Sequence, residues 1–282
     1  MKLVLKLFSI CVLLLSVTMT TYAQNPTGVI MTEAGSQDKQ EGSIDDIVEK
    51  RLTVEKRVLP YETLREADIM WEKRIWRVID TREKMNLPFA YPDRPFFQIL
   101  MESAINEDIT VYSTEDDKFT NPLTAEEVAS QGASVDTVIT FDPETYEEKI
   151  QIVRNEINFE DVKRFRLKEV WFFDEESSRM DVRILGIAPL LDVKDEAGNF
   201  LREQPMFWVY YPEVRQILAR EQYFNDGNDA SPLTWEDIME MRFFSSYIYK
   251  ESNVRDERIQ DFLSSGIDRL LEGDKIRREI FN

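Results

Sequence analysis

The sequence of 282 residues predicts an α+β fold, a mainly antiparallel sheet flanked by helices and preceded by a flexible N-terminal arm. Apolar residues at helical spacing occur toward both ends of the folded part of the chain. The centre instead holds short runs rich in Val, Ile, Phe and Trp that are separated by turn residues, which is typical of antiparallel strands. The length fits one larger domain or two modest ones.

Residues 61–86 are predicted to form a long helix. Its main apolar stripe follows a spacing of about 100° per residue, and prolines at 60 and 88 bracket it. Ile69 and Trp76 fall outside this stripe but align with each other, because seven residues are close to two helical turns. They form either a second buried face under a loop or an exposed anchor for another subunit, which makes them candidate protein-interface residues. In the second case, Trp76→Asp would leave the fold intact and weaken assembly.

The remaining elements are predicted from periodicity, capping residues and turns. Thr124 with Glu127, and Thr234 with Asp237, are each predicted to cap a short helix. The other predicted helices cover residues 95–106, 212–220 and 254–271, the last ending at Gly273. Predicted strands cover residues 109–112, 135–141, 149–153, 165–174, 179–188, 190–194, 200–202, 206–211 and 243–250. The strand at 206–211 is aromatic on both faces and is therefore predicted to be central and covered on both sides.

The N-terminus has the three-part pattern of a secretory signal peptide. Lys2 and Lys6 precede an apolar run too short to span a membrane, and Thr21-Tyr22-Ala23 forms a cleavage site before Gln24. A lipoprotein is the competing interpretation, but Ile10 precedes Cys11 and Cys11 lies inside the apolar run. The predicted organisation is therefore a signal peptide (1–23), a mobile polar arm (24–56) that either stays disordered or orders on a neighbour, and an α+β domain (57–282).

Composition restricts the partners of this exported chain. Without Lys2 and Lys6, 33 of the 35 basic residues remain against 54 acidic ones, so the formal charge is −21. Such a surface repels nucleic acids and anionic head groups, and favours a locally basic protein surface. No further apolar stretch approaches a transmembrane length, so no membrane span is expected.

The residues needed for common catalytic chemistry are missing. The chain has no histidine, and its one cysteine lies in the predicted signal peptide. Ser-His and Cys-His pairs, zinc sites and thiolate chemistry are therefore excluded, and no Gly-x-Gly or P-loop occurs. Ser36 and Lys39 form a Ser-x-x-Lys in a polar tail, which is attributed to chance. We expect no enzyme activity, cofactor or metal, and no catalytic residue is assigned.

Two weaker patterns compete with this expectation. Asp226, Asn228 and Asp229 lie in an NDGND loop that is either a weak calcium site or, more simply, a turn, because the ligand pattern of an EF-hand is missing. A glycosidase needs only two suitably spaced carboxylates, and nothing selects a pair among the 54 acidic residues.

Five long strings make the chain resemble the GldN/PorN family of the type IX secretion system of Bacteroidota. They are VLPYETLREADIMWEKRIWRVIDTREKMNLPF, ITVYSTEDDKFTNPL, KEVWFFDEESSRMDVRILGIAPL, FWVYYPEVRQILA and SPLTWEDIMEMRFFSSYIYKESN. The resemblance runs from about Val58 to the last helix. The family has no catalytic signature, so the resemblance supplies no active-site residue.

The resemblance implies a structural role in the periplasm. GldN-like proteins form a ring with a GldK-like lipoprotein at the inner face of the outer membrane, which also implies self-association through the ring. The ring contacts the periplasmic part of the GldL–GldM motor, and the machine exports proteins with a C-terminal sorting domain. Two other functions stay open at this point: a periplasmic glycan hydrolase that uses paired carboxylates, and a soluble periplasmic chaperone or cargo adaptor.

Overall fold

The computed structural model describes residues 55–132, 134–141, 148–155, 159–194 and 199–282. The chain divides into two units, Met1–Glu49 and Lys50–Asn282, and every described residue belongs to the second. The predicted signal peptide (1–23) and most of the predicted arm (24–56) lie outside the described residues. So does most of the predicted turn after Phe141.

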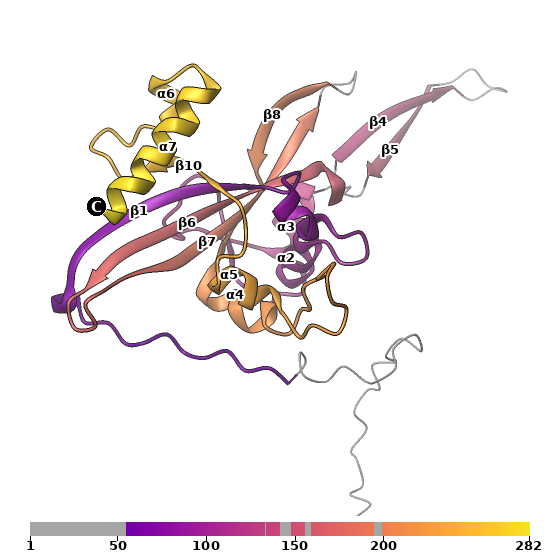
Figure 1. Ribbon diagram of the computed structural model, residues 1–282. Coiled ribbons are helices and arrows are strands. Elements are labelled where there is room, and N and C mark those ends of the chain that lie inside the picture. The colour runs from indigo at the N-terminus through magenta and orange to yellow at the C-terminus, as the bar shows by residue number, and fades with distance from the viewer. Residues whose placement is uncertain (1–54, 133, 142–147, 156–158, 195–198) are drawn as a thin grey trace, which may run out of the picture. The chain divides into compact units, whose positions relative to one another are not determined.

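The described part is an α+β fold, as predicted, built on one antiparallel sheet (Figure 1). The sheet has eight strands in the order β10-β1-β6-β7-β9-β2-β3, and β8 pairs with the far end of β7. Its strands are β1 (Ile69–Asp80), β2 (Val111–Tyr112), β3 (Pro122–Leu123), β6 (Val162–Asp174), β7 (Arg179–Lys194), β8 (Phe200–Pro205), β9 (Trp208–Tyr210) and β10 (Tyr247–Glu251). A separate two-stranded sheet pairs β4 (Ser134–Phe141) with β5 (Glu148–Asn155).

Helices cover the sheet. The α-helices are α2 (Phe96–Ile105), α3 (Ala125–Gly132), α4 (Tyr211–Leu218), α5 (Trp235–Glu240), α6 (Ile259–Phe262) and α7 (Gly266–Phe281). The 3-10 helices are η1 (Glu66–Asp68), η2 (Lys84–Ala90) and η3 (Phe159–Asp161). In the described residues no helix is both long and apolar enough to cross a bilayer.

The prediction of a long helix over residues 61–86 is wrong, because the centre of that segment is strand β1. β1 pairs with β6 in an unbroken antiparallel register from Trp71–Phe173 to Asp80–Arg164. Its last six residues, 75–80, are all buried, so both faces of the strand are covered. A strand covered on both faces loses the alternating pattern. The Glu, Lys and Arg residues of this segment favour a helix, so the sequence pattern resembles one. Pairing with β6 overrides this propensity.

Most of the other predicted elements are confirmed. Both predicted capping boxes form: the amide of Glu127 donates to Thr124 Oγ1 at 3.3 Å, and the amide of Asp237 donates to Thr234 Oγ1 at 3.4 Å. The hairpin of β6 and β7 is paired from Asp174–Arg179 inward. The strand predicted over residues 206–211 is shorter than expected, since β9 covers Trp208–Tyr210 and Tyr211 begins α4, but it lies between β7 and β2 as an interior strand, as predicted.

The predicted C-terminal helix over residues 254–271 is wrong in its bounds. The chain forms the short α6 and then α7, which continues to Phe281, and Gly273 lies buried inside α7 instead of ending it. A Cβ at Gly273 would lie 2.9 Å from the carbonyl oxygen of Ile248 on β10. The glycine is therefore required by the close approach of α7 to β10, and not by a helix end.

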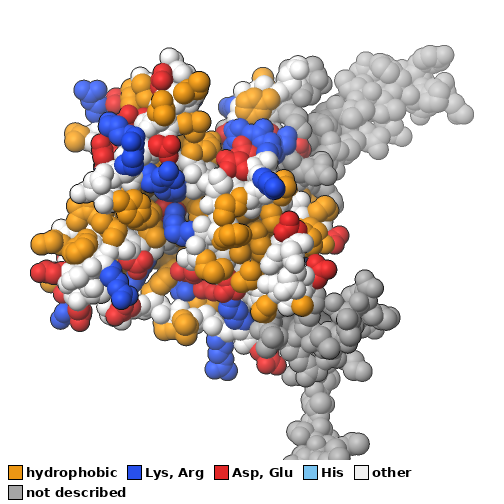
Figure 2. Space-filling view, in the orientation of Figure 1, with side chains coloured by type: hydrophobic (Ala, Val, Ile, Leu, Met, Phe, Trp, Pro, Cys, Tyr) orange, Lys and Arg blue, Asp and Glu red, His pale blue; other side chains and the backbone are white. Residues whose placement is uncertain are grey.

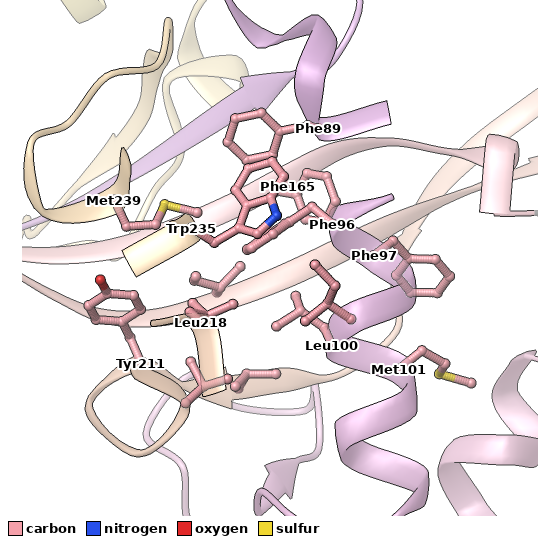
Figure 3. Close-up of a cluster of buried hydrophobic side chains, with 14 of the residues drawn as sticks. Phe89, Phe96, Phe97, Leu100, Met101, Phe165, Tyr211, Leu218, Trp235 and Met239 are labelled. Atoms are coloured by element: carbon pink, nitrogen blue, oxygen red, sulfur yellow. The ribbon is translucent and has the colours of Figure 1, made fainter. Parts of the chain in front are cut away.

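The largest hydrophobic core is rich in aromatic side chains (Figure 3). The Trp235 ring lies 4.8 Å from Phe89 and 4.6 Å from Phe96, centroid to centroid, and Phe96 lies 5.2 Å from Phe165. These contacts join η2, α2, α5 and β6 around one cluster. Each buried aromatic side chain removes about 150–250 Å² from water, so this cluster contributes a large share of the apolar area that the fold buries.

Two smaller cores complete the packing. One places Ile276 and Ile280 of α7 with Ile259 against Ile75, Trp171 and Ile248 of the sheet. The other contains Trp76, Ala188 and Trp208, with Tyr112, Phe119 and Tyr249 packed around them. Ile75 and Trp76 are neighbours on β1, and neighbouring side chains of a strand point to opposite faces of the sheet. The two cores therefore lie on opposite faces.

Candidate functional site

The structure does not bring the two predicted interface residues together. Ile69 begins β1 and Trp76 lies at its middle, so about 23 Å of extended strand separates them at roughly 3.3 Å per residue. The helical alignment on which their pairing rested is therefore wrong. Ile69 is half-buried and Trp76 is 6% exposed. Contact of either residue with another subunit stays a prediction.

Trp76 lies under a loop formed by residues 113–121. Its indole N–H donates to Asp117 Oδ2 at 2.7 Å, and Lys250 Nζ lies 4.6 Å from the ring centroid. Lys168 donates to the carbonyl oxygen of Asp117, and burial lowers the pKa of Lys168 while Asp117 opposes that shift. This arrangement matches the first of the two interpretations of Trp76, a buried side chain beneath a loop.

A pocket rich in arginine lies on the other face of the sheet, next to the core that α7 forms with it. Its volume is about 210 Å³. The residues that line it are Arg77, Trp171, Arg242, Phe244, Ser246, Arg277 and Phe281. We call this set the arginine pocket. It draws on β1, β6, the segment after α5, and α7.

Glu169 is the carboxylate that holds two of these arginines. Its side chain is completely buried on β6, next to an irregularity in the β6–β7 pairing. Arg242 Nη2 donates to Glu169 Oε1 at 2.7 Å, and the indole N–H of Trp171 donates to Oε2 at 3.2 Å. Arg77 Nε lies 3.3 Å from the same Oε2, close enough for an ion pair but without hydrogen-bond alignment.

The electrostatics of the arginine pocket are unbalanced toward positive charge. Burial lowers the pKa of Arg77, Glu169 opposes this, and the nearby charges of Arg242 and Arg277 lower the pKa further. The Arg242 guanidinium also lies over Trp171 and Phe244, at 5.4 and 5.5 Å from their ring centroids. Aromatic faces stabilise a cation without neutralising it.

Residues 55–64 run along α4 and α5. Lys56 forms an ion pair with Asp237 and donates to Thr234 Oγ1 at 2.9 Å. The Tyr61 hydroxyl donates to Glu240 at 2.6 Å, and the guanidinium carbon of Arg215 lies 3.9 Å from the Tyr61 ring centroid. Burial, followed by the hydrogen bond to Glu240, raises the pKa of Tyr61. Lys56, the last residue of the predicted arm, is thus attached to the folded unit.

An exposed apolar surface covers the outer side of α6 and of the first half of α7. Its members are Phe262 (55% exposed), Ile267 (72%), Leu270 (53%) and Leu271 (58%). We call it the α7 apolar face. Figure 2 shows orange side chains over α6 and α7 beside blue ones. Exposed apolar groups gathered on one helix face are typical of interaction surfaces.

In the described part of the chain, no group of three or more His, Cys, Asp or Glu is arranged so that it could hold a metal ion. In the NDGND loop two asparagine side chains accept hydrogen bonds from backbone amides. Asn225 Oδ1 accepts from the amide of Gly227 at 3.1 Å, and Asn228 Oδ1 accepts from that of Ala230 at 3.1 Å. These are the contacts of a turn.

The arginine pocket and the α7 apolar face are the two surface features of the described residues that we consider as candidate sites. The family model for the gliding motility associated protein GldN matches residues 64–282. The chain therefore belongs to the GldN family, which places it among the components of gliding motility and type IX secretion. A search of curated proteins finds no match.

The sequence interpretation missed both surfaces. The arginine pocket combines residues from four segments that are distant in the sequence, so no local spacing pattern indicates it. The members of the α7 apolar face follow the apolar spacing of an amphipathic helix, so the sequence alone does not distinguish them from a buried stripe. A usable signal was present in the second half of the helix, where Ile276 and Ile280 continue an i, i+4 pattern past Gly273.

Proposed function

We propose that this protein is a structural, non-catalytic subunit of the periplasmic ring of the type IX secretion and gliding machinery. It assembles with a GldK-like lipoprotein at the inner face of the outer membrane and contacts the periplasmic part of the GldL–GldM motor. Membership of the GldN family supports the assignment to this machinery. The α7 apolar face supports assembly through protein contacts.

The α7 apolar face is the structural observation that carries the proposal. α7 buries Gly273, Ile276 and Ile280 against the sheet, while Ile267, Leu270 and Leu271 of the same helix stay in water. Exposing a leucine or isoleucine side chain forfeits about 1.5–3 kcal/mol of burial. A subunit that is covered by a neighbour in the assembly recovers this free energy, and a monomeric enzyme or a free adaptor would not.

Co-expression with the GldK-like lipoprotein tests the proposal directly. We expect closed rings by electron microscopy, and loss of secretion of proteins with a sorting domain when the gene is deleted. Normal secretion in a deletion strain that lacks a paralogue would overturn the proposal. Discrete binary complexes without rings would favour the chaperone or adaptor function. Turnover of a glycan that a single Asp or Glu substitution removes would favour the hydrolase.

A further inference from the structure

The arginine pocket carries more positive charge than its own carboxylate neutralises. Glu169 is shared by Arg77 and Arg242, at 3.3 and 2.7 Å. Arg277 at the rim pairs with Asp274, at 3.2 Å, and with no other carboxylate among the described residues, and both side chains are more than half exposed. Water screens such an exposed pair strongly, so Asp274 does little to balance the buried charges.

Donor groups in the arginine pocket lack acceptors within the described residues. Arg242 Nη1 and Arg77 Nε are both inaccessible to water and make no hydrogen bond. The Arg77 side chain is only 8% exposed. A buried donor without a partner is costly, and more so when it is charged. The ion pairs with Glu169 therefore leave the positive charge of these two guanidinium groups incompletely satisfied inside the fold.

The backbone of Arg242 is held in a conformation that favours glycine. Its φ is 55°, and it occupies the position after the last turn of α5 where a left-handed residue closes the helix. The amide of Phe243 donates to Ile238 at 2.9 Å and that of Arg242 to Met239 at 3.2 Å, the two bonds of a Schellman motif. Glycine would close this helix without strain. An arginine there directs a guanidinium into the pocket, and strain of this kind is typical of functional positions.

The size and walls of the arginine pocket fit one side chain. Its volume of about 210 Å³ is below the range of about 300–1,000 Å³ that sites for drug-sized molecules occupy. Trp171, Phe244 and Phe281 form apolar walls, and Phe281 and Arg277 at the rim are exposed, so the pocket is open to solvent. Guanidinium groups bind carboxylates through paired, charge-assisted hydrogen bonds.

We propose that the arginine pocket receives a glutamate or aspartate side chain from an acidic segment of a partner protein. The guanidinium groups bind the carboxylate, and the aromatic walls contact its methylene groups and the residue beside it. A free phosphate would leave these walls unused. The identity of the partner as a ring component rests on the proposed function, but binding of the carboxylate does not. Because the chain carries a formal charge of −19, a basic pocket is a local exception that orients an acidic segment.

A titration of the purified chain with a matched pair of small probes tests the proposal. The probes are N-acetyl-glutamate methylamide and its neutral counterpart N-acetyl-glutamine methylamide, at constant ionic strength. The readout is the Nε–Hε nuclear magnetic resonance signals of Arg77 and Arg242, assigned through single Arg→Lys substitutions. We expect a saturable shift with the glutamate probe and none with the glutamine probe.

Two neighbouring arginines of α7 supply the matched variants. Arg277→Gln removes a guanidinium from the pocket rim, whereas Arg278→Gln makes the same change at an exposed position that does not line the pocket. Loss of one charge-assisted contact weakens binding roughly tenfold, so we expect that effect for Arg277→Gln and no change for Arg278→Gln. Equal melting temperatures of the two variants establish that both fold.

The outcomes that overturn the proposal are separate from those that overturn the ring subunit. Absence of a saturable shift, an equal response to both probes, or tighter saturation by inorganic phosphate rejects the carboxylate site and leaves the ring proposal intact. In cells, Arg277→Gln should reduce secretion of sorting-domain proteins and Arg278→Gln should not. Normal secretion with Arg277→Gln would reject a role of the pocket in assembly even if the probe binds.

Discussion

The ring of Phe119 fills the space that a side chain at Gly186 would need. A Cβ on Gly186 would lie 2.5 Å from Cζ and 2.8 Å from Cε1 of Phe119. Phe119 itself has a φ of 59° and packs edge-on against Trp208, with ring centroids 6.1 Å apart. The glycine on β7 thus permits the 113–121 loop to close over Trp76.

Gly186→Ala should therefore destabilise the protein and displace the loop. Forcing extra volume into a packed site costs about 1–3 kcal/mol, which urea unfolding measures. Gly227→Ala is the control, since the new Cβ would lie 3.5 Å from Asn225 Oδ1, an ordinary contact distance, and we expect little change there. Equal stability of Gly186→Ala and the wild type would contradict the packing of Phe119 against β7.

Glu169→Gln should be among the most damaging single substitutions in the sheet. It leaves Arg77 and Arg242 without a buried counter-charge, and breaking a buried ion pair from one side costs about 3–5 kcal/mol. Glu72→Gln is the matched control on β1, because the Glu72 side chain is 46% exposed. The midpoint of urea denaturation separates the two variants. A loss below that of the control would show that the arginines do not depend on Glu169.

The ion pairs of Asp80 should make part of the protein's stability depend on pH. Hydrogen bonds from the Arg82 side chain lower the pKa of Asp80 well below its usual range. Burial opposes this shift, and a hydrogen bond from Arg164 adds to it. A carboxyl with a depressed folded-state pKa stabilises the protein above its unfolded-state pKa of about 3.9, and this contribution is lost as the pH falls below that value. Asp80→Asn should therefore be less stable at pH 7 by about 1–3 kcal/mol.

The difference between Asp80→Asn and the wild type should shrink as the pH falls. At pH 7 Asp80 is ionised in both states and is bound to two arginines in the folded state. Below the unfolded-state pKa of about 3.9 the carboxyl of the unfolded wild type takes up a proton first, which stabilises the unfolded state and reduces the difference, so we expect equal differences at pH 7 and 5 and a smaller one at pH 3. Urea unfolding at pH 7, 5 and 3 measures the difference. A difference that stays constant over this range would mean that the charge of Asp80 contributes nothing to stability.

The burial of Trp76 changes what its substitution is expected to do. From the sequence, Trp76→Asp was expected to spare the fold and to weaken assembly. Beneath the loop, an aspartate would face Asp117 and leave a cavity, and truncating a buried tryptophan costs about 3–5 kcal/mol. We now expect a large drop in melting temperature for Trp76→Asp and a smaller one for Trp76→Phe. A folded Trp76→Asp monomer with impaired ring formation would restore the interface interpretation.

Leu270→Asp should separate assembly from folding. Leu270 is 53% exposed on the α7 apolar face, so the change should alter the free energy of unfolding by no more than about 0.5 kcal/mol. Ring formation with the lipoprotein should be lost, because a charge would then lie in the contact. Ile276→Asp on the buried side of α7 is the contrasting variant and should unfold the protein. Normal rings with Leu270→Asp would exclude the α7 apolar face from the assembly.

The sequence predicted the antiparallel α+β fold because turn residues and alternating strands are local signals. The β6–β7 hairpin and the capping boxes at Thr124 and Thr234 were found on that basis. β1 was missed because burial on both faces erased its period, and the strand is defined by a partner about ninety residues away along the chain. The end of α7 was missed because Gly273 serves the contact with Ile248, which only the folded chain reveals.

Less of the candidate site could be predicted. Arg77, Arg242 and Arg277 are ordinary charged residues in the sequence, and only the fold brings them to one pocket, where Glu169 pairs with the first two. An isolated glycine in a strand, such as Gly186, is a general sign of close backbone approach, and it offered a clue to the covered face around Trp76. The pairing of Ile69 with Trp76 failed because it depended on the period of a helix that does not form.

The contacts of Lys56 and Tyr61 with α5 fix where this segment lies on the folded unit. Lys56 is held by Asp237 and Tyr61 by Glu240, on one helix. A fluorophore or gold label placed immediately upstream of Lys56 would thus mark the α5 side of each subunit. In images of an assembly, such a label would report the orientation of every copy without disturbing α7 or the arginine pocket.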